Sequence, residues 1–228
     1  MKSIKLDGRL SSVAELVRQG AVFADIGTDH GYLPLYLLDS GVISFAYLSD
    51  INEGPLLSAM ENAREYGLYS KCEFLLSDGL SSLPRNKVTD IAICGMGAEL
   101  IVKILSEAKD ICARGVRLIL QPMSHPEILR EYLYREGFRV LTEKYSYANK
   151  KYYVTILAEF CNDAQKIDIF TKNFGEECYL LPLNNATRGY LNTRLNALTR
   201  ECRGRELGGL DKDELPRLID YINKILEK

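Results

Sequence analysis

Short apolar runs alternate with helix-patterned segments from Val22 to Phe160. Runs of this length, rich in branched and aromatic residues, are typical of strands in a sheet. They are Val22–Ile26, Phe45–Asp50, Cys72–Leu76, Asp90–Cys94, Val116–Leu120, Phe138–Lys144 and Tyr152–Phe160. Between them, apolar residues recur at helical spacing in Leu56–Tyr66, Leu100–Ala108 and Pro126–Glu136. This alternation predicts an α/β fold with a doubly wound, seven-stranded and mostly parallel sheet.

The last two predicted strands follow one another without a helix between them. The sheet is therefore expected to end in an antiparallel pair, because a parallel connection needs a crossover. A seventh strand of this kind is a feature of class I methyltransferases rather than of dinucleotide dehydrogenases.

The pattern changes after Phe160. Two apolar stripes at helical spacing, separated by Gly204–Gly209, predict an antiparallel helical hairpin. The stripes are Leu191, Leu195, Leu198 and Cys202, then Leu215, Leu218, Ile219, Ile222, Ile225 and Leu226. We therefore expect a sheet domain over residues 1–160 and a helical domain over residues 161–228.

Composition narrows the class of protein. The 228 residues are 46% hydrophobic, enough for a full core and a second small unit. Charges interrupt the first twenty residues and no later run has membrane-spanning length, so a cytoplasmic location is expected. The net charge of -2 argues against a globally basic protein but leaves room for a local basic face. Six dispersed cysteines without a CxxC pair predict buried, reduced thiols rather than disulfides or metal ligands.

The turn after the first strand contains acidic residues at positions where a phosphate-binding loop would have glycine. It reads Asp25-Ile26-Gly27-Thr28-Asp29-His30-Gly31, which departs from the G-x-G-x-x-G spacing of dinucleotide sites. Ligands of open α/β sheets gather at the carboxyl ends of the strands. Two carboxylates there would repel a diphosphate and attract the ammonium and sulfonium groups of S-adenosylmethionine, while the glycines let the backbone approach a ligand.

Three further strand ends complete this picture. Asp50 can accept hydrogen bonds from two ribose hydroxyls. Asp78-Gly79 suits an adenine amino group, and Gly95-Met96-Gly97 leaves space for the methionine part of the cofactor and for the substrate. Each motif has a simpler explanation when it is taken alone: a tight strand-helix turn, a helix cap at Asp50, or a core methionine. Their shared position after successive strands favours a cofactor site.

Several segments, in this order, resemble the bacterial tRNA (adenine-22-N1)-methyltransferase family. They are Leu6–Leu10, Ala24–Pro34, Asp78–Leu80, Cys94–Gly97, Leu118–Pro122 and Lys151–Tyr153. The resemblance covers about the first 160 residues. For the C-terminal part it extends only to the presence of a helical hairpin. The family usually has Gly-Met-Gly-Gly and Gln-Pro-Asn, where this chain ends the two motifs with Ala98 and Met123.

The resemblance implies a class I Rossmann-like domain, S-adenosylmethionine as methyl donor, and a coiled-coil-like C-terminal domain that helps to hold tRNA. Because the sequence has no membrane-spanning run and no metal-ligand spacing, neither a membrane nor a metal is expected, and no obligate protein partner is evident. The resemblance also implies cofactor contacts at Arg9, Leu10, Asp25, Gly27, Thr28, Gly31, Asp50, Ile51, Asp78, Gly79, Gly95, Met96 and Gly97.

Methylation at adenine N1 needs little acid-base chemistry. N1 has a free lone pair, so catalysis can rest on positioning. The product base is cationic, and a carboxylate can stabilise the charge that develops. Asp29 is the first candidate for this carboxylate and Asp7 the second. His30 either orients the target base or the carboxylate, or serves only as a structural hydrogen-bond partner. The chain lacks the Asn-Pro-Pro-aromatic signature of amino-group methylation, which favours a ring nitrogen.

The predicted first C-terminal helix carries arginines that can contact RNA phosphates. The candidates are Arg188, Arg194, Arg200 and Arg203. Nearby acids make an ordinary solvated helix face the alternative. Two other functions stay open at this point: a methyltransferase acting on another RNA or a small molecule, and a non-catalytic module that binds a nucleotide or a protein partner.

Overall fold

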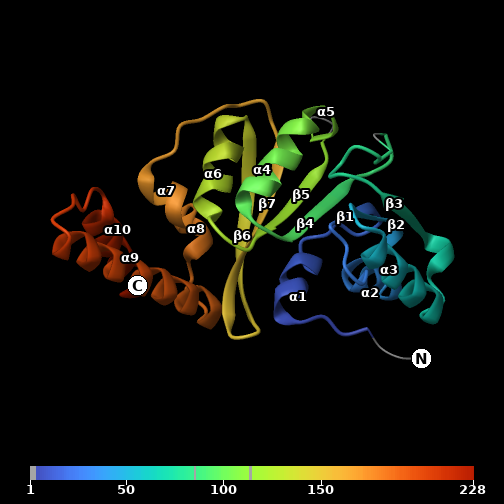
Figure 1. Ribbon diagram of the computed structural model, residues 1–228, viewed down its shortest axis with the longest axis horizontal. Helices are drawn as coiled ribbons and strands as arrows, with labels where there is room; N and C mark the ends of the chain where they lie inside the picture. Colours follow the sequence, from blue (N-terminus) through green and yellow to red (C-terminus); the bar gives the residue numbers. More distant parts are fainter. Residues whose placement is uncertain (1–3, 85, 113–114) are drawn as a thin grey trace.

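One mixed sheet organises the molecule (Figure 1). The computed structural model describes residues 4–84, 86–112 and 115–228, and within these residues seven strands pair in the order β3-β2-β1-β4-β5-β7-β6. The strands are β1 (Ala21–Ile26), β2 (Ile43–Asp50), β3 (Cys72–Leu76), β4 (Asp90–Met96), β5 (Arg117–Pro122), β6 (Phe138–Ala148) and β7 (Lys151–Phe160). The first five are parallel, whereas β7 runs antiparallel to both β5 and β6. This arrangement confirms the predicted Rossmann-like methyltransferase fold.

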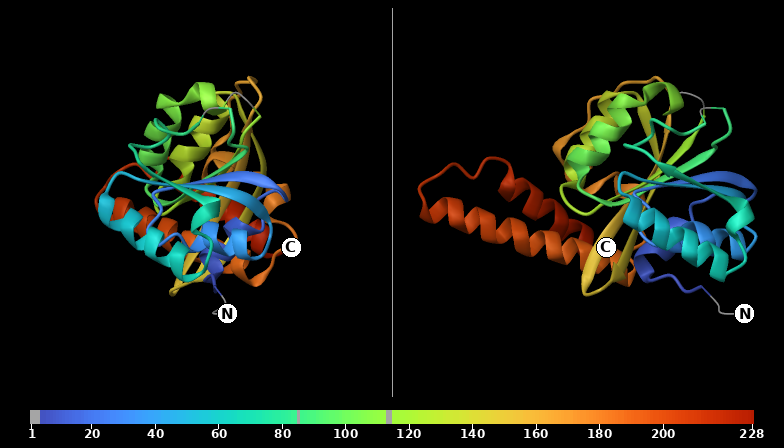
Figure 2. Two further views of the ribbon diagram at one scale, coloured as in Figure 1. Left: turned by 90° about the vertical axis from the view of Figure 1, so that its right-hand side faces the viewer. Right: turned by 45° about the vertical axis from the view of Figure 1, so that its right-hand side comes forward.

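Helices cover both faces of the sheet (Figures 1 and 2). They are α1 (Gly8–Ala14), α2 (Tyr32–Asp39), α3 (Glu53–Glu65), α4 (Ala98–Glu107), α5 (Lys109–Cys112) and α6 (Pro126–Arg135), with a 3-10 turn at Tyr69–Lys71. Successive side chains of a strand point to opposite faces. Phe23 accordingly joins a core with α2 and α3, while its neighbour Ala24 joins a second core with α4 and α6.

The C-terminal part consists of α7 (Ile169–Phe174), α8 (Glu177–Leu180), α9 (Asn185–Leu207) and α10 (Leu215–Leu226). The last two helices form the predicted antiparallel hairpin, which projects from the sheet (Figure 2). The start of α9 packs on β6 and β7, so that Tyr190 and Leu191 share a core with the sheet. The helical hairpin is thus anchored at one end.

The structure departs from the sequence pattern in a few places. The short helices α1, α5, α7 and α8 were not predicted, and β6 continues to Ala148 rather than ending at Lys144. The prediction of buried thiols is wrong for Cys161 and Cys178, which are exposed. The extra residues of β6 pair with β7, and Tyr145 among them is buried. Of the helices described, none is both long and apolar enough to cross a bilayer.

Candidate active site

Two cavities lie at the carboxyl ends of the parallel strands, and they meet at Gly27 and Cys94. The larger, about 340 Å³, is lined by polar and glycine residues at the ends of β2, β3 and β4 and by the apolar side chains of Ile26, Ile51, Met96, Leu100 and Ile104. The smaller, about 120 Å³, is lined by residues of α1 and of the turn after β1. Of the predicted cofactor residues, Asp50, Ile51, Asp78, Gly79, Gly95 and Met96 line the larger cavity, and Arg9, Leu10, Asp25 and Gly31 the smaller.

The remaining two predicted cofactor residues lie behind this surface. Thr28 is almost completely buried, and its backbone N–H donates to the carbonyl of Ser49 at 3.0 Å. Gly97 is the N-cap of α4, close to the Ser124 side chain. A separate and larger cavity of about 580 Å³, between α1, β6 and the segment before α9, is lined by none of the predicted cofactor residues.

The glycines of the first turn are required by the protein's own packing. Gly27 has a φ of +74°, and a Cβ there would come within 2.2 Å of the Met96 Cε. Gly31 has a φ of +70°, and its Cβ would meet Leu48 at 2.8 Å. A side chain at either position would be strained and would displace the wall of the site. Both glycines are therefore needed for the backbone of the turn to pack against Met96 and Leu48.

Asp25 is the most perturbed carboxyl of the site. Its side chain is only 8% exposed at the junction of the sheet and the smaller cavity. Burial raises the pKa of Asp25 to about 6, and the neighbouring charge of Asp50 adds to this while the Arg9 guanidinium opposes it. A cation placed beside this buried carboxyl group would stabilise its ionised form.

Arg9 is positioned by a buried polar network. Its Nη1 donates to Gln121 Oε1 at 3.2 Å, and Gln121 Nε2 donates back to the Arg9 carbonyl at 3.1 Å. The same amide donates to Thr155 Oγ1 at 2.7 Å, and Ser12 lies within 2.9 Å of that hydroxyl. Gln121 is fully buried. This network fixes α1 against β5 and β7 and thereby holds Arg9 at the cavity.

The three candidate catalytic residues differ in their positions. Asp29 and His30 line the smaller cavity at its rim, with His30 Nε2 at 3.6 Å from Asp29 Oδ2. Asp7 instead caps α1, where its Oδ1 accepts from the Leu10 N–H at 2.8 Å. Its second oxygen accepts from Asn149 Nδ2 at 3.4 Å. Asp29 and His30 therefore lie at the rim of the smaller cavity, whereas Asp7 caps α1.

Comparisons with known proteins agree with this geometry. Residues 6–156 match a family described as a methyltransferase domain. The tRNA (adenine(22)-N(1))-methyltransferase of Bacillus subtilis (strain 168) is 40% identical over 159 residues, which cover 70% of this chain and 67% of that protein. The chain belongs to the tRNA (adenine(22)-N(1))-methyltransferase family.

Solved structures of similar proteins extend the likeness over nearly the whole chain. The crystal structure of the B. subtilis m1A22 tRNA methyltransferase TrmK has a TM-score of 0.80 at 30% identity, covering 98% of this chain and 97% of that one. A Streptococcus pneumoniae protein crystallised with S-adenosyl-L-methionine has a TM-score of 0.83 at 30% identity, covering 97% and 100%. This methyltransferase thus shares its helical C-terminal part with them as well as its sheet.

The predicted RNA-binding arginines of this family member have different surroundings. Arg188 Nη1 donates to the Leu226 carbonyl at 2.8 Å and ties α9 to α10. Arg194 Nη2 lies 3.7 Å from Glu127 Oε2 and joins α9 to α6. Arg200 and Arg203 are exposed on α9, and the Arg200 Nε bonds to the carbonyl of Asn196 on its own helix. The last two present their charge to solvent.

Sequence reasoning missed two parts of this site. Gln121 was identified only as part of a family motif, although a glutamine that follows a buried strand directly signals a polar group at the ligand edge. The apolar side chains of Leu100 and Ile104 also line the larger cavity. They were assigned to a helix stripe, and nothing in the sequence separates a stripe that packs on the sheet from one that reaches a ligand. In the described residues, no cluster of three or more His, Cys, Asp or Glu side chains is arranged to hold a metal.

Proposed function

We propose that this protein transfers the methyl group of S-adenosylmethionine to N1 of adenine 22 in tRNA. The observation that carries this proposal is the set of carboxylates around the joined cavities. Asp25, Asp50 and Asp78 lie at or just after the carboxyl ends of three neighbouring strands, β1, β2 and β3, and line the joined cavities. Together they suit a ligand rich in hydroxyl and amino groups and carrying positive charge.

The donor set fits S-adenosylmethionine. When bound, this cofactor supplies an electrophilic methyl group on a sulfonium. Asp50 would accept from the ribose hydroxyls, and Asp78 would hold the adenine side of the larger cavity next to the apolar wall of Ile51, Leu100 and Ile104. Asp25 would face the cationic amino-acid part in the smaller cavity, and Arg9 is suited to its carboxylate.

Asp29 and His30 would then serve the target base. Adenine N1 attacks with its own lone pair, so no base has to remove a proton first. The ring becomes positive during transfer, and a carboxylate fixed nearby stabilises that charge. Asp29 lies at the rim of the smaller cavity, which supports this role, whereas the capping bonds of Asp7 argue for a positioning role.

We assign the cofactor to residues 1–160 and tRNA contact to residues 161–228 together with the rim of the site. The exposed guanidiniums of Arg200 and Arg203 support contact with phosphates. Adenine N1 is hidden in a Watson-Crick pair, so the target nucleotide must be unpaired or flipped outward before transfer. A tRNA substrate also implies a cytoplasmic location.

The test is a transfer assay with labelled S-adenosylmethionine and two unmodified tRNA transcripts that carry either A or G at position 22. Label in the A22 transcript alone, mapped to N1, is the expected result. Cofactor binding without transfer to either transcript would contradict the tRNA assignment. A different RNA, a small molecule or a binding role would then take its place.

A further inference from the structure

The strands β6 and β7 continue past the sheet as a two-stranded ribbon. β7 pairs with β5 only between Ile156 and Glu159, but it pairs with β6 down to Lys151. Because β7 is antiparallel to β5, its first residues extend beyond the carboxyl ends of the parallel strands. That edge holds the two cofactor cavities. We call residues 144–152 the hairpin tip.

The hairpin tip is held on both sides. A Cβ on Gly8 of α1 would come within 2.5 Å of the Tyr147 carbonyl oxygen, and Asn149 Nδ2 donates to Asp7 Oδ2. On the other side, a Cβ on Gly189 of α9 would lie 2.2 Å from the Tyr152 ring. The tip therefore connects α1, which carries Arg9 at the cavity, with the start of α9. It is a fixed surface between the two parts assigned to cofactor and tRNA.

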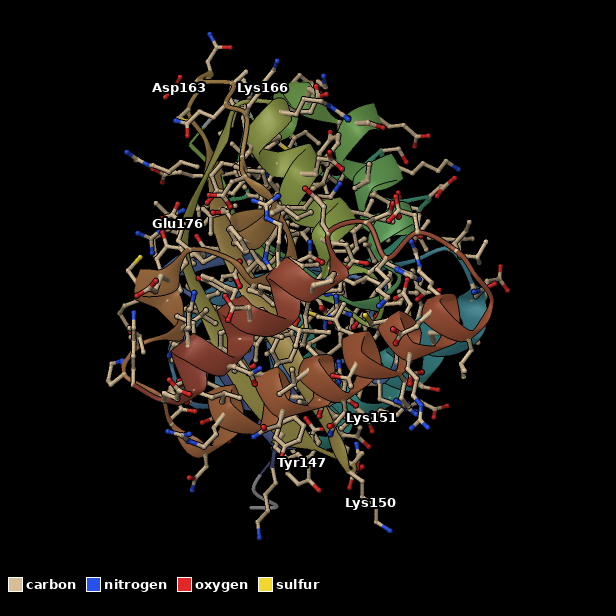
Figure 3. The ribbon with its side chains drawn as sticks, turned by 90° about the vertical axis from the view of Figure 1, so that its left-hand side faces the viewer. Tyr147, Lys150, Lys151, Asp163, Lys166 and Glu176 are labelled. Atoms are coloured by element: carbon tan, nitrogen blue, oxygen red, sulfur yellow. The ribbon has the colours of Figure 1, made fainter. Side chains whose placement is uncertain are left out.

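The exposed side chains of the tip are basic and aromatic. No acidic residue occurs in the sequence between Glu143 and Glu159. Lys150 and Lys151 are exposed, and within the described part of the chain neither makes an ion pair. The Tyr147 side chain is 52% exposed, and its ring lies 4.7 Å from that of Tyr152. Figure 3 shows Tyr147, Lys150 and Lys151 together at one end of the molecule, beside α9.

We propose that the hairpin tip is a tRNA-binding surface, with Lys150 and Lys151 on phosphates and the Tyr147 ring against an unpaired nucleotide. The inference rests on the proposed function, since it names the element that would guide the tRNA from α9 to the cavity. Exposed lysines without carboxylate partners suit a polyanion. Aromatic rings next to basic side chains suit the bases of unpaired RNA.

The test compares two double variants of the full-length protein. Lys150→Asn with Lys151→Gln removes both charges, and Asn is tolerated at position 150, where φ is +62°. The matched control is Lys87→Gln with Lys166→Gln, because both lysines are exposed and precede β4 or follow β7 at the opposite edge of the sheet. Figure 3 shows Lys166 far from the tip.

Binding of the A22 transcript is measured by filter binding at about 50 to 200 mM salt, a range over which phosphate contacts change the affinity strongly. The Kd for the cofactor is measured on the same variants. The hairpin variant should bind tRNA about tenfold more weakly, with a log-log salt slope shallower by about 1.4 to 1.8, as expected for two lost phosphate contacts. Its cofactor Kd should match that of the unaltered protein. Tyr147→Ala should weaken tRNA binding about fivefold or more while Tyr147→Phe keeps it.

Equal tRNA affinity and salt slope in the hairpin and control variants, with methyl transfer to the A22 transcript intact in the unaltered protein, would overturn this inference and leave the proposed function standing. An unaltered protein that methylates no transcript would remove the proposed function itself. The two failures are thus distinguished in one set of measurements.

Discussion

Arg130 and Glu143 form a two-bonded ion pair inside the core: Nε donates to Oε1 at 2.7 Å and Nη2 to Oε2 at 2.8 Å. Both side chains are almost fully buried. The guanidinium also donates to the Asn173 carbonyl at 2.9 Å, and the Tyr145 hydroxyl donates to Glu143. The pair thus joins α6 and β6 to the end of α7, where the chain turns toward the C-terminal helices.

Glu143→Gln should be strongly destabilising, because it leaves the Arg130 charge buried without a counter-charge. We expect the free energy of unfolding to fall by about 3 to 5 kcal/mol, measured by urea titration. Glu159→Gln is the matched control, since it removes the carboxylate from an exposed pair with Arg139. That change should cost less than about 1 kcal/mol. Equal effects of the two substitutions would contradict the importance of the buried pair.

Asp25→Asn should stabilise the ligand-free protein at neutral pH. The folded pKa of about 6 lies above the ordinary 3.8, so the folded state binds the Asp25 proton more tightly than the unfolded state. The contribution of this group to stability is fully present below pH 4 and is lost as the pH rises through 6. A difference of about two pKa units corresponds to about 3 kcal/mol. Urea titrations should therefore show an advantage of the variant that grows between pH 4 and pH 7.5, and a constant difference would argue against the raised pKa.

Cofactor binding should have the opposite dependence on the same proton. A cation beside Asp25 requires the carboxylate form, so the Kd for S-adenosylmethionine should rise as the pH falls below about 6, by at most tenfold per pH unit. Asp25→Asn should bind more weakly at pH 7.5 and lose this dependence. Asp50→Asn should also bind more weakly but keep it, which makes it the control. Calorimetric titrations at several pH values give the Kd of the unaltered protein and of both variants. A Kd of the unaltered protein that does not change with pH would mean that the cation lies elsewhere.

Local patterns were enough to find Asp50 and Asp78, because one ends an apolar strand, the other lies two residues after one, and strand ends of a parallel sheet share one edge. The same reasoning could not find the Arg130–Glu143 pair. Arg130 lies on a helix whose sequence resembles an ordinary amphipathic one, and its remaining partners are carbonyls more than forty residues away. Burial of such a pair depends on the tertiary path of the chain.

Asp7 illustrates a different limit. The need for a carboxylate near the methylated base made Asp7 a catalytic candidate, but the residues after it, Gly8-Arg9-Leu10, begin a helix that needs an N-cap. The helix is too short for a periodic apolar pattern to reveal it. Conversely, the strand β6 was predicted to end at Lys144, whereas cross-strand pairing with β7 extends it to Ala148.

Asp29→Asn should separate chemistry from cofactor binding. The side chain is 80% exposed at the rim of the smaller cavity, so its removal should leave the S-adenosylmethionine Kd within about twofold. If Asp29 stabilises the positive charge on the methylated base, the single-turnover rate should fall about tenfold or more. Asp7→Asn is the comparison, because it keeps an N-cap for α1 and should preserve the rate. A wild-type rate for Asp29→Asn with normal cofactor binding would exclude Asp29 from this role.

Two glycines in α9 should respond in opposite ways to alanine. Gly204 has open space around its Cβ position, so Gly204→Ala should raise the free energy of unfolding by about 0.5 to 1 kcal/mol through helix propensity. Gly189→Ala gains the same propensity, but its Cβ would come within 2.2 Å of the Tyr152 ring. That ring lies between α9 and the Tyr147 ring, so the Tyr152 side chain and its contact with Tyr147 must shift, at a cost of about 1 to 3 kcal/mol. Urea titration of both variants measures the difference, and a Gly189→Ala protein as stable as Gly204→Ala would show that α9 does not press on the hairpin. If the tip also guides tRNA, Gly189→Ala should weaken tRNA binding while Gly204→Ala leaves it unchanged.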